Sequence, residues 1–141
     1  MAYSAKQYAL WLLARRSYSV FKLKEKLLTK YAPEEVEGTI DFLKNIQLLD
    51  DSDYGVRRAV FLSKKKSNRQ IKFELSQKGL APEDIEDSLL EVDDEEVRVK
   101  NLLEKEKITP LTKDKLIQKY CRKGFKYSTI KKLIDELIDK E

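Results

Sequence analysis

One pattern of residues occurs twice in this chain at a spacing of 45 positions, and it restricts the possible folds more than any other feature. The pattern is a run of apolar residues at helical spacing, a lysine–glycine pair and then further apolar residues. Its positions superpose without a gap: Ile71, Leu75, Lys78, Gly79, Leu80 and Ile85 match Leu116, Tyr120, Lys123, Gly124, Phe125 and Ile130. A repeat of this length is typical of small helical units that stack on one another, because one unit alone cannot bury a core.

A third copy of the pattern lies near the start of the chain. It has one residue fewer in the turn and comprises Leu23, Leu27, Lys30 and Val36. The segments that open the second and third units also correspond, since both begin with an aspartate pair, at 50–51 and at 93–94. We therefore predict an all-α fold of three tandem three-helix repeats that form an elongated, curved array. The expected units are residues 2–49, 50–92 and 93–141.

Helix boundaries can be predicted from the polar residues between the apolar stripes. Serine and aspartate often cap helix starts, and we expect this of Ser19 and of the pair Asp50–Asp51. Pro33 and Pro82 are expected in first turns, where a helix tolerates proline. Capping boxes are predicted at two further starts, one from Ser67 with Gln70 and the other from Asp93 with Glu96. Left-handed helix ends are expected at Gly79 and Gly124.

The residue types that build most active sites are rare or absent. The chain has no histidine, which is the commonest general base and metal ligand, and a single cysteine cannot build a zinc site. It also lacks a glycine-rich loop of the kind that cradles phosphates. We therefore expect a protein that is not an enzyme and has no cofactor or metal. Cys121 is interpreted as a small buried apolar residue.

The strongest positive feature is a basic tract in the middle unit. Residues 55–78 contain eight basic side chains and a single acid, Glu74. This tract is either a solvated surface beside a turn or a contact for phosphates or for an acidic protein surface. On the second interpretation, the candidate partner-binding residues are Arg57, Arg58, Lys64, Lys65, Lys66, Arg69 and Lys72. Lys64, Lys65 and Lys66 are expected to end one helix, and Arg69 to lie in the first turn of the next.

An acidic tract follows, with nine acids and no base in residues 83–96. It is either a solvated surface, a contact for a basic partner or a shield against indiscriminate DNA binding. The tyrosines are expected to pack within the fold, because they are not spaced as a stacking platform for bases. The net charge of only +4 also argues against a general DNA-binding protein.

The cellular setting can be predicted from the same composition. A lone cysteine favours a reducing compartment, where disulfides are rare. The longest apolar run near the start, residues 8–14, is too short to span a membrane, and we see no signal peptide. A cytoplasmic monomer without membrane contact is the expectation.

The order and spacing of several motifs resemble the RecX family, the regulatory proteins of the RecA recombinase. Residues 9–16 read ALWLLARR, similar to the family's opening A-L-x-L-L-A-R-R. Residues 49–54 read LDDSDY, similar to the family's L-D-D-x-x-aromatic pattern. Residues 71–80 read IKFELSQKGL, similar to I-x-x-E-L-x-x-K-G-I, and KGF at 123–125 resembles the family's closing G-[FY].

This resemblance implies a curved helical protein that lodges in the groove of the RecA nucleoprotein filament. There it would oppose filament growth, ATP hydrolysis and strand exchange during DNA repair and recombination. The implied partner is the RecA filament, with single- or double-stranded DNA as a weaker contact.

Two other classes of function stay open at this point. The first is a helix-turn-helix DNA-binding regulator, although no helix is rich in the Arg, Asn and Gln of a recognition helix. Sequence-specific binding to duplex DNA would identify it. The second is a helical scaffold for small protein partners, which would affect neither RecA nor DNA.

Overall fold

The structure is a computed structural model that describes residues 3–139. Over these residues the chain forms nine α-helices and no β-strand, as the apolar periodicity predicts. The helices are α1 Ala5–Arg15, α2 Val20–Leu28, α3 Pro33–Asn45, α4 Asp51–Leu62, α5 Asn68–Gln77, α6 Pro82–Leu90, α7 Glu95–Glu104, α8 Lys113–Arg122 and α9 Tyr127–Asp139.

Most of the predicted helix boundaries are confirmed. The Ser19 side chain accepts from the Lys22 amide, and Asp50 accepts from the first amides of α4. Pro33 and Pro82 each lie in a first turn. The main-chain φ angles of 80° at Gly79 and 95° at Gly124 are left-handed.

Both predicted capping boxes need correction. Ser67 accepts a hydrogen bond from the Gln70 amide, but the reciprocal bond from the Ser67 main-chain amide to the Gln70 side chain is not formed. The N-cap of α7 is Asp94, one residue after the predicted Asp93, and its side chain accepts no capping bond. Glu95 faces the preceding unit instead, so the start of α7 is held by contacts outside its own helix.

Three separate apolar cores follow one another along the chain. The first is formed by α1–α3, the second by α4–α6 and the third by α7–α9. Fully buried residues at their centres include Leu23, Leu75 and Ile134. Each core is small, so contacts between neighbouring units must add to its stability.

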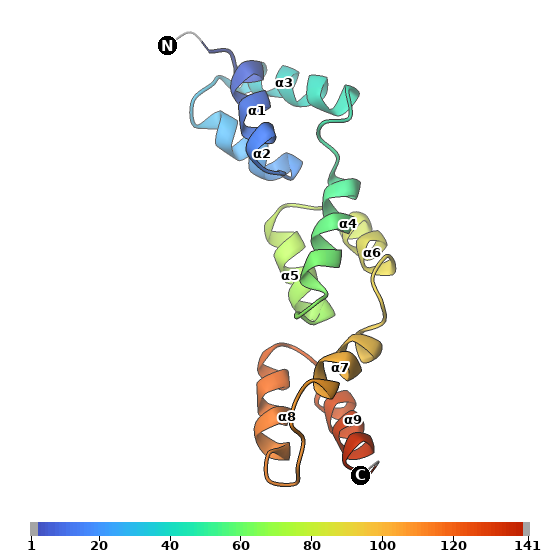
Figure 1. The fold of residues 1–141 in the computed structure, drawn as a ribbon. Coiled ribbons are helices and arrows are strands. Elements are labelled where there is room, and N and C mark those ends of the chain that lie inside the picture. Colours follow the sequence, from blue (N-terminus) through green and yellow to red (C-terminus); the bar gives the residue numbers. More distant parts are fainter. Residues whose placement is uncertain (1–2, 140–141) are drawn as a thin grey trace.

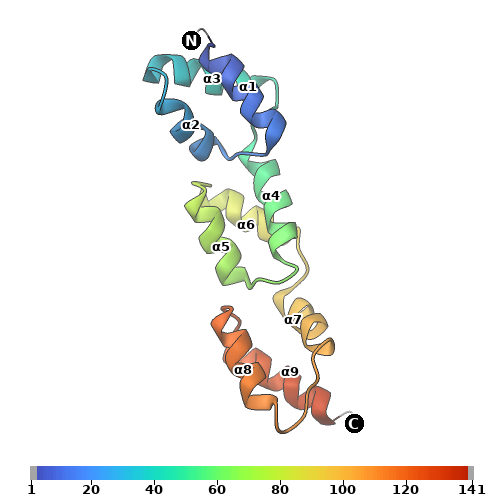
Figure 2. The ribbon, with the colours of Figure 1, turned by 60° about the vertical axis from the view of Figure 1, so that its left-hand side comes forward.

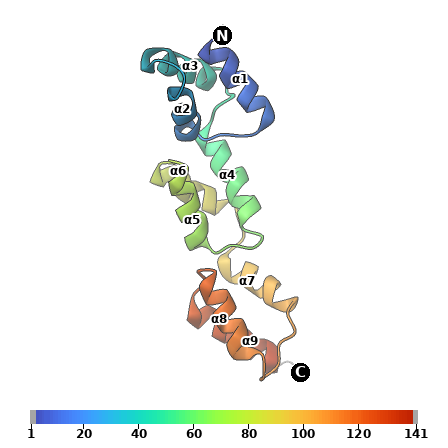
Figure 3. The same ribbon diagram turned by 90° about the vertical axis from the view of Figure 1, so that its left-hand side faces the viewer.

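The three groups of helices form an elongated array (Figure 1). The first helices of the groups, α1, α4 and α7, lie along one side, and the second helices, α2, α5 and α8, lie along the other (Figures 2 and 3). The predicted all-α repeat fold is therefore confirmed. The domain boundaries 2–49, 50–92 and 93–141 stay a prediction. None of the helices in the described part of the chain has the length and apolarity that crossing a bilayer requires.

Candidate partner-binding cleft

Neighbouring units are joined by the same hydrogen bond at both junctions. The hydroxyl of Ser19, at the start of α2, donates to the main-chain carbonyl of Lys78 at 2.6 Å. The hydroxyl of Ser67, at the start of α5, donates to the carbonyl of Lys123 at 2.9 Å. Each serine therefore caps its own helix and also binds the C-terminal end of the second helix in the next unit.

The glycines after these two lysines allow the units to approach closely. A Cβ atom at Gly79 would overlap the side chain of Phe21, and one at Gly124 would overlap the hydroxyl of Ser67. Both positions also require a left-handed backbone, which glycine adopts without strain. The lysine–glycine pair of the repeat is thus a junction element as well as a helix end.

A second bond recurs at each junction, from a main-chain amide to a carboxylate. The Val20 amide donates to the Asp51 carboxylate at 2.8 Å, and the Asn68 amide donates to the Glu95 carboxylate at 2.9 Å. Asp51 and Glu95 are the first residues of α4 and α7. Partial burial raises the pKa of Asp51, whereas the bond from Val20 opposes that rise.

Arg98 closes the second junction. Its guanidinium donates to the carbonyls of Ser63 at 3.2 Å, Lys66 at 2.8 Å and Asp93 at 3.0 Å, and to the Asn68 side chain at 2.7 Å. The residue is only 6% exposed, and burial lowers its pKa. Arg98 therefore supplies donors to the turn after α4, where helix-terminal carbonyls lack partners.

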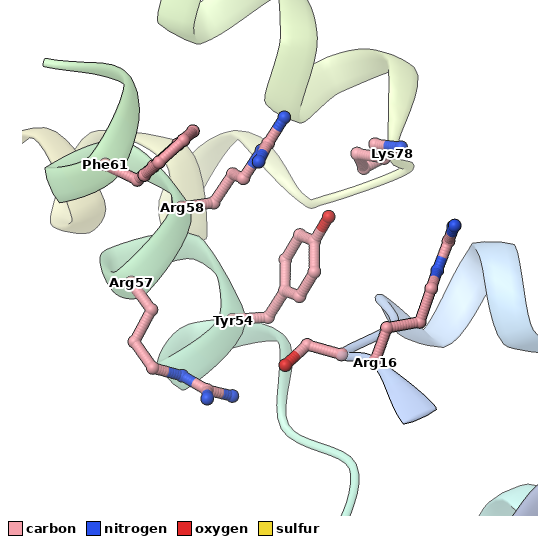
Figure 4. Close-up of a pocket in the computed structure, with 7 residues that line it drawn as sticks. Arg16, Tyr54, Arg57, Arg58, Phe61 and Lys78 are labelled. Atoms are coloured by element: carbon pink, nitrogen blue, oxygen red, sulfur yellow. The ribbon is translucent and has the colours of Figure 1, made fainter. Parts of the chain in front are cut away.

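The first junction is open at the corresponding position. Tyr54 is the fourth residue of α4, as Arg98 is of α7, but it leaves a cleft of about 430 Å³ between the first two units. In Figure 4 its ring stands between Arg58 and Arg16. The cleft is lined by Arg16, Ser17, Tyr54, Arg57, Arg58, Phe61 and Lys78.

The cations of this cleft differ in how they are paired. Arg57 binds Asp53 at 3.0 Å and Arg58 binds Glu74 at 3.2 Å. Arg16 and Lys78 take part in none of the ion pairs within residues 3–139. The cleft therefore carries excess positive charge and can receive a carboxylate or a phosphate.

Aromatic surface completes the cleft. Phe61 is 60% exposed, and its ring lies 5.4 Å from the Arg58 guanidinium and 5.9 Å from the Lys64 ammonium. Burial raises the pKa of the Tyr54 hydroxyl, which stays protonated near neutral pH and can donate a hydrogen bond. The cleft thus combines cations, one hydroxyl and an apolar ring.

Comparisons with known proteins identify the family. Residues 5–43 match the family model described as "RecX, first three-helix domain". Regulatory protein RecX of Clostridioides difficile is 35% identical over 150 residues, which cover 99% of this chain and 70% of that protein. The chain belongs to the RecX family. Regulatory protein RecX of Clostridium botulinum is 30% identical over 131 residues, which cover 85% of this chain and 62% of the relative. The chain thus spans about two thirds of the length of these two RecX proteins.

A solved RecX structure shows the same fold. The crystal structure of RecX from Lactobacillus salivarius superposes with a TM-score of 0.79 over 94% of both chains, at 24% identity. A second, titled "Crystal structure of regulatory protein RecX", gives a TM-score of 0.74 over 93% of this chain, at 23% identity. The RecX resemblance of the sequence motifs is therefore confirmed for both family and fold.

The structure divides the candidate residues of the basic tract into groups. Arg57 and Arg58 line the cleft, and Lys64 lies at its Phe61 edge. Lys66 binds Glu74 at 3.6 Å and so shares a carboxylate with Arg58. The tract and the cleft therefore overlap on α4 and the turn that follows it.

The remaining candidates lie away from the cleft. Lys72 binds Glu86 of α6 at 3.5 Å, which directs it to another side of α5. Lys65 and Arg69 are exposed, and Arg69 lies in the first turn of α5 as predicted. The expected position of Lys64, Lys65 and Lys66 at a helix end is wrong, because α4 ends at Leu62 and the three lysines lie in the connection between α4 and α5.

Sequence reasoning missed three of the residues that shape the junctions. Arg16 comes from the first unit, and only the fold brings it beside Arg58. Lys78 lies in the basic tract but is not among the candidate residues. Arg98 was not singled out, since a charged residue on a helix is normally exposed. The lysine of the repeat pattern was the signal that could have placed Lys78 at a junction.

Proposed function

We propose that the chain binds the RecA nucleoprotein filament and inhibits its recombinase and ATPase activities in DNA repair and recombination. Membership of the RecX family supports a regulatory role, and the filament is the partner that the family resemblance implies. The protein acts by occupying a surface and catalyses no reaction. The observation that carries the proposal is the cationic cleft between the first two units.

The cleft and the basic tract supply the electrostatic contact. Arg57 and Arg58 lie in the cleft, and Lys64, Lys65 and Lys66 extend the positive surface along the next turn. Arg69 and Lys72 extend it onto α5. The exposed ion pairs of the tract are each weak, about 0–1 kcal/mol, so an acidic partner can displace them at little cost.

The preferred contact is an acidic face of RecA, with DNA as a weaker one. Four of the seven candidates already have acidic partners within the chain, namely Arg57, Arg58, Lys66 and Lys72. The nearby acids of α6 and of the segment before α7 would also repel a continuous phosphate backbone. A protein surface with a few carboxylates fits this mixed pattern better than a nucleic acid does.

The proposal is tested by single-strand-dependent ATP hydrolysis by RecA, measured with and without this protein. The expected result is a rate that falls as the protein is added. An unchanged rate with sequence-specific binding to duplex DNA would favour the helix-turn-helix regulator. An unchanged rate without DNA binding would favour the scaffold for small protein partners.

The contribution of α5 is tested with the charge-reversed variant Arg69→Glu/Lys72→Glu. We expect weaker inhibition than that of the parent, with less dependence on salt. If phosphates are contacted, each lost contact lowers the salt slope of affinity by about 1. Lys131→Glu/Lys132→Glu is the matched control, because both lysines are exposed and ion-paired on α9. A folded α5 variant that inhibits as well as this control at two salt concentrations would remove Arg69 and Lys72 from the contact.

A further inference from the structure

The first unit carries an uncovered copy of the face that forms the junctions elsewhere. Tyr8 is the fourth residue of α1, the position of Tyr54 in α4 and of Arg98 in α7. In the second and third units this face meets the turn of the preceding unit. In the first unit it is a hollow of about 680 Å³, lined by Tyr3, Gln7, Tyr8, Trp11, Lys30 and Tyr31.

The chemistry of this face differs from that of the junctions. Asp51 and Glu95 are the first residues of their helices, and each accepts a hydrogen bond from a main-chain amide of the preceding unit. Helix α1 instead begins with Ala5, whose side chain cannot accept a hydrogen bond. A preceding repeat could not form that bond here. Trp11 stands seven residues into α1, where α4 has Arg57. At this seventh helix position the face of the first unit is therefore aromatic, whereas the corresponding position at the first junction is charged.

A second copy of this chain does not fit the face either. The turn that would meet this face is the one between α7 and α8, and the N-cap there is Thr112. The Thr112 hydroxyl already binds the carbonyls of Lys107 and Thr109, at 3.0 and 3.2 Å. Ser19 and Ser67 instead direct their hydroxyls to the next unit. The turn between α7 and α8 therefore lacks the free donor that a repeat junction uses.

The arrangement of the rings argues against the stacking of nucleobases. Tyr8 and Trp11 already stack on each other, with centroids 6.0 Å apart and planes at 15°. Lys30 lies 4.4 Å from the Tyr8 ring centre, and Arg15 lies 4.8 Å from that of Trp11. Tyr31 is tilted against Tyr8 at 6.2 Å. A base would need to displace these cations, because single strands bind to free ring faces.

The same features suit a protein partner that is acidic. Trp11 is 54% exposed, and tryptophan, tyrosine and arginine dominate the energetic centres of protein interfaces. The cations Arg15 and Lys30 take part in none of the ion pairs between residues 3 and 139. These two cations border an apolar hollow, where they can bind the carboxylates of a partner.

We infer that this aromatic face binds an acidic protein segment. The segment inserts one apolar side chain among Tyr3, Tyr8 and Tyr31 and places carboxylates on Lys30 and Arg15. Where the proposed function holds, RecA supplies that segment and the filament touches the first unit at two places. The face lies near the start of α1, and the cationic cleft includes Arg16 just beyond its end, so both are within reach of one extended partner.

Trp11 is the only tryptophan of the chain and reports directly on the face. The protein is labelled with 5-fluorotryptophan, and its single fluorine resonance is followed by NMR. The probes are a peptide of glutamates around leucine and phenylalanine, the same peptide with lysine for glutamate, oligo-thymidylate, and RecA assembled on oligo-thymidylate. We expect saturable shifts with the glutamate peptide and the RecA filament, and none with the other two.

The outcomes separate this inference from the proposed function. A filament that binds by co-sedimentation without a change at Trp11 would overturn the inference and leave the function standing. A shift with the glutamate peptide but no binding to the filament would support the inference about this face and contradict the proposed function. A shift of the fluorine resonance with oligo-thymidylate alone would show that the face binds nucleic acid. The absence of a shift with the glutamate peptide would contradict an acidic protein partner.

Variants test the residues of the face by co-sedimentation with the filament. Trp11→Ala and Lys30→Glu are expected to weaken binding by at least about tenfold, as for residues at an interface centre. Lys30→Arg should retain binding, because it keeps the charge. Tyr127→Ala is the matched control, since Tyr127 is an exposed aromatic residue of α9 at 57% exposure. Equal binding by Trp11→Ala, Lys30→Glu and the control would remove the face from the interaction.

Discussion

The two junctions between units share the pattern of their main-chain bonds and differ in the side chain at the fourth position of the following helix. Ser19 and Ser67 each bind a lysine carbonyl of the next unit, and Asp51 and Glu95 each bind an amide of the preceding one. At the fourth position of the next helix, however, the second junction has Arg98 and the first has Tyr54. The repeat therefore sets how units dock, and at this position one junction has an arginine bound to the neighbouring turn while the other has a tyrosine beside a cationic cleft.

Closure of the second junction should couple the second and third cores. Leu75 and Ile134 are fully buried, one on each side of it. We expect Leu75→Ala and Ile134→Ala each to lower the free energy of unfolding by roughly 2–5 kcal/mol, the usual cost of emptying a buried aliphatic site. Denaturant titration followed by circular dichroism measures both. A negligible shift for either variant would mean that its core does not contribute to the cooperative unit.

The difference between the junctions can be tested directly with arginine truncations. Arg98→Ala leaves the part-buried carbonyls of Ser63 and Lys66 without this charged donor, and we expect a loss of about 2–4 kcal/mol. Arg58→Ala at the first junction removes a half-exposed ion pair and should cost less than about 1 kcal/mol. Thermal melting of both variants is the measurement. Equal losses would mean that the closed and open junctions are energetically alike.

The shared bonds should contribute alike at both junctions. Ser19→Ala and Ser67→Ala each remove a helix cap and a bond between units, and the expected loss is about 1–2 kcal/mol for each. Thr29→Ala is the control, because the Thr29 hydroxyl donates a hydrogen bond only within its own unit, to the Lys26 carbonyl. Serine variants no less stable than this control would show that the bonds between units add nothing.

The smallest expected effect concerns pH at the first junction. Burial raises the pKa of Asp51 in the folded chain above its ordinary value of 3.8. The folded state therefore binds this proton more tightly than the unfolded state, so this group's contribution to stability falls as pH rises from about 3.8 through the raised value. Asp51→Asn keeps an acceptor for Val20 and removes the titration.

The variant should gain stability relative to the parent across that window and keep the gain at higher pH. Melting temperatures of both proteins measured between acidic and neutral pH give the comparison. If the melting temperature of the parent rises relative to that of the variant as pH increases, the start of α4 stabilises the charged carboxylate instead.

Much of the fold was predictable because its determinants are local. Apolar stripes, prolines in first turns and the lysine–glycine pairs each act within a few residues, and the repeat then indicated the tandem units. The errors at Asp93 and at the end of α4 share a physical cause. Glu95 is held by the preceding unit, and the three lysines after Leu62 lie in a turn that is closed by Arg98.

The candidate cleft was only partly predictable, because its residues come from two units. Arg57 and Arg58 could be chosen from charge density alone. Arg16 is far from them in sequence, and the ion pair that turns Lys72 toward Glu86 depends on how α5 packs beside α6. The gathering of tyrosines around Trp11 also depends on the fold, since Tyr31 follows α2 and the others precede or belong to α1.

The central claim is that the cations of the open junction contact the RecA filament. Its most direct test is inhibition of single-strand-dependent ATP hydrolysis by RecA, measured for the cleft variant Arg16→Glu/Lys78→Glu against the control Lys131→Glu/Lys132→Glu. The two variants change the net charge equally and should melt close to the parent. The account predicts that the cleft variant loses most of the inhibition while the control retains it. Equal inhibition by both folded variants would contradict the account.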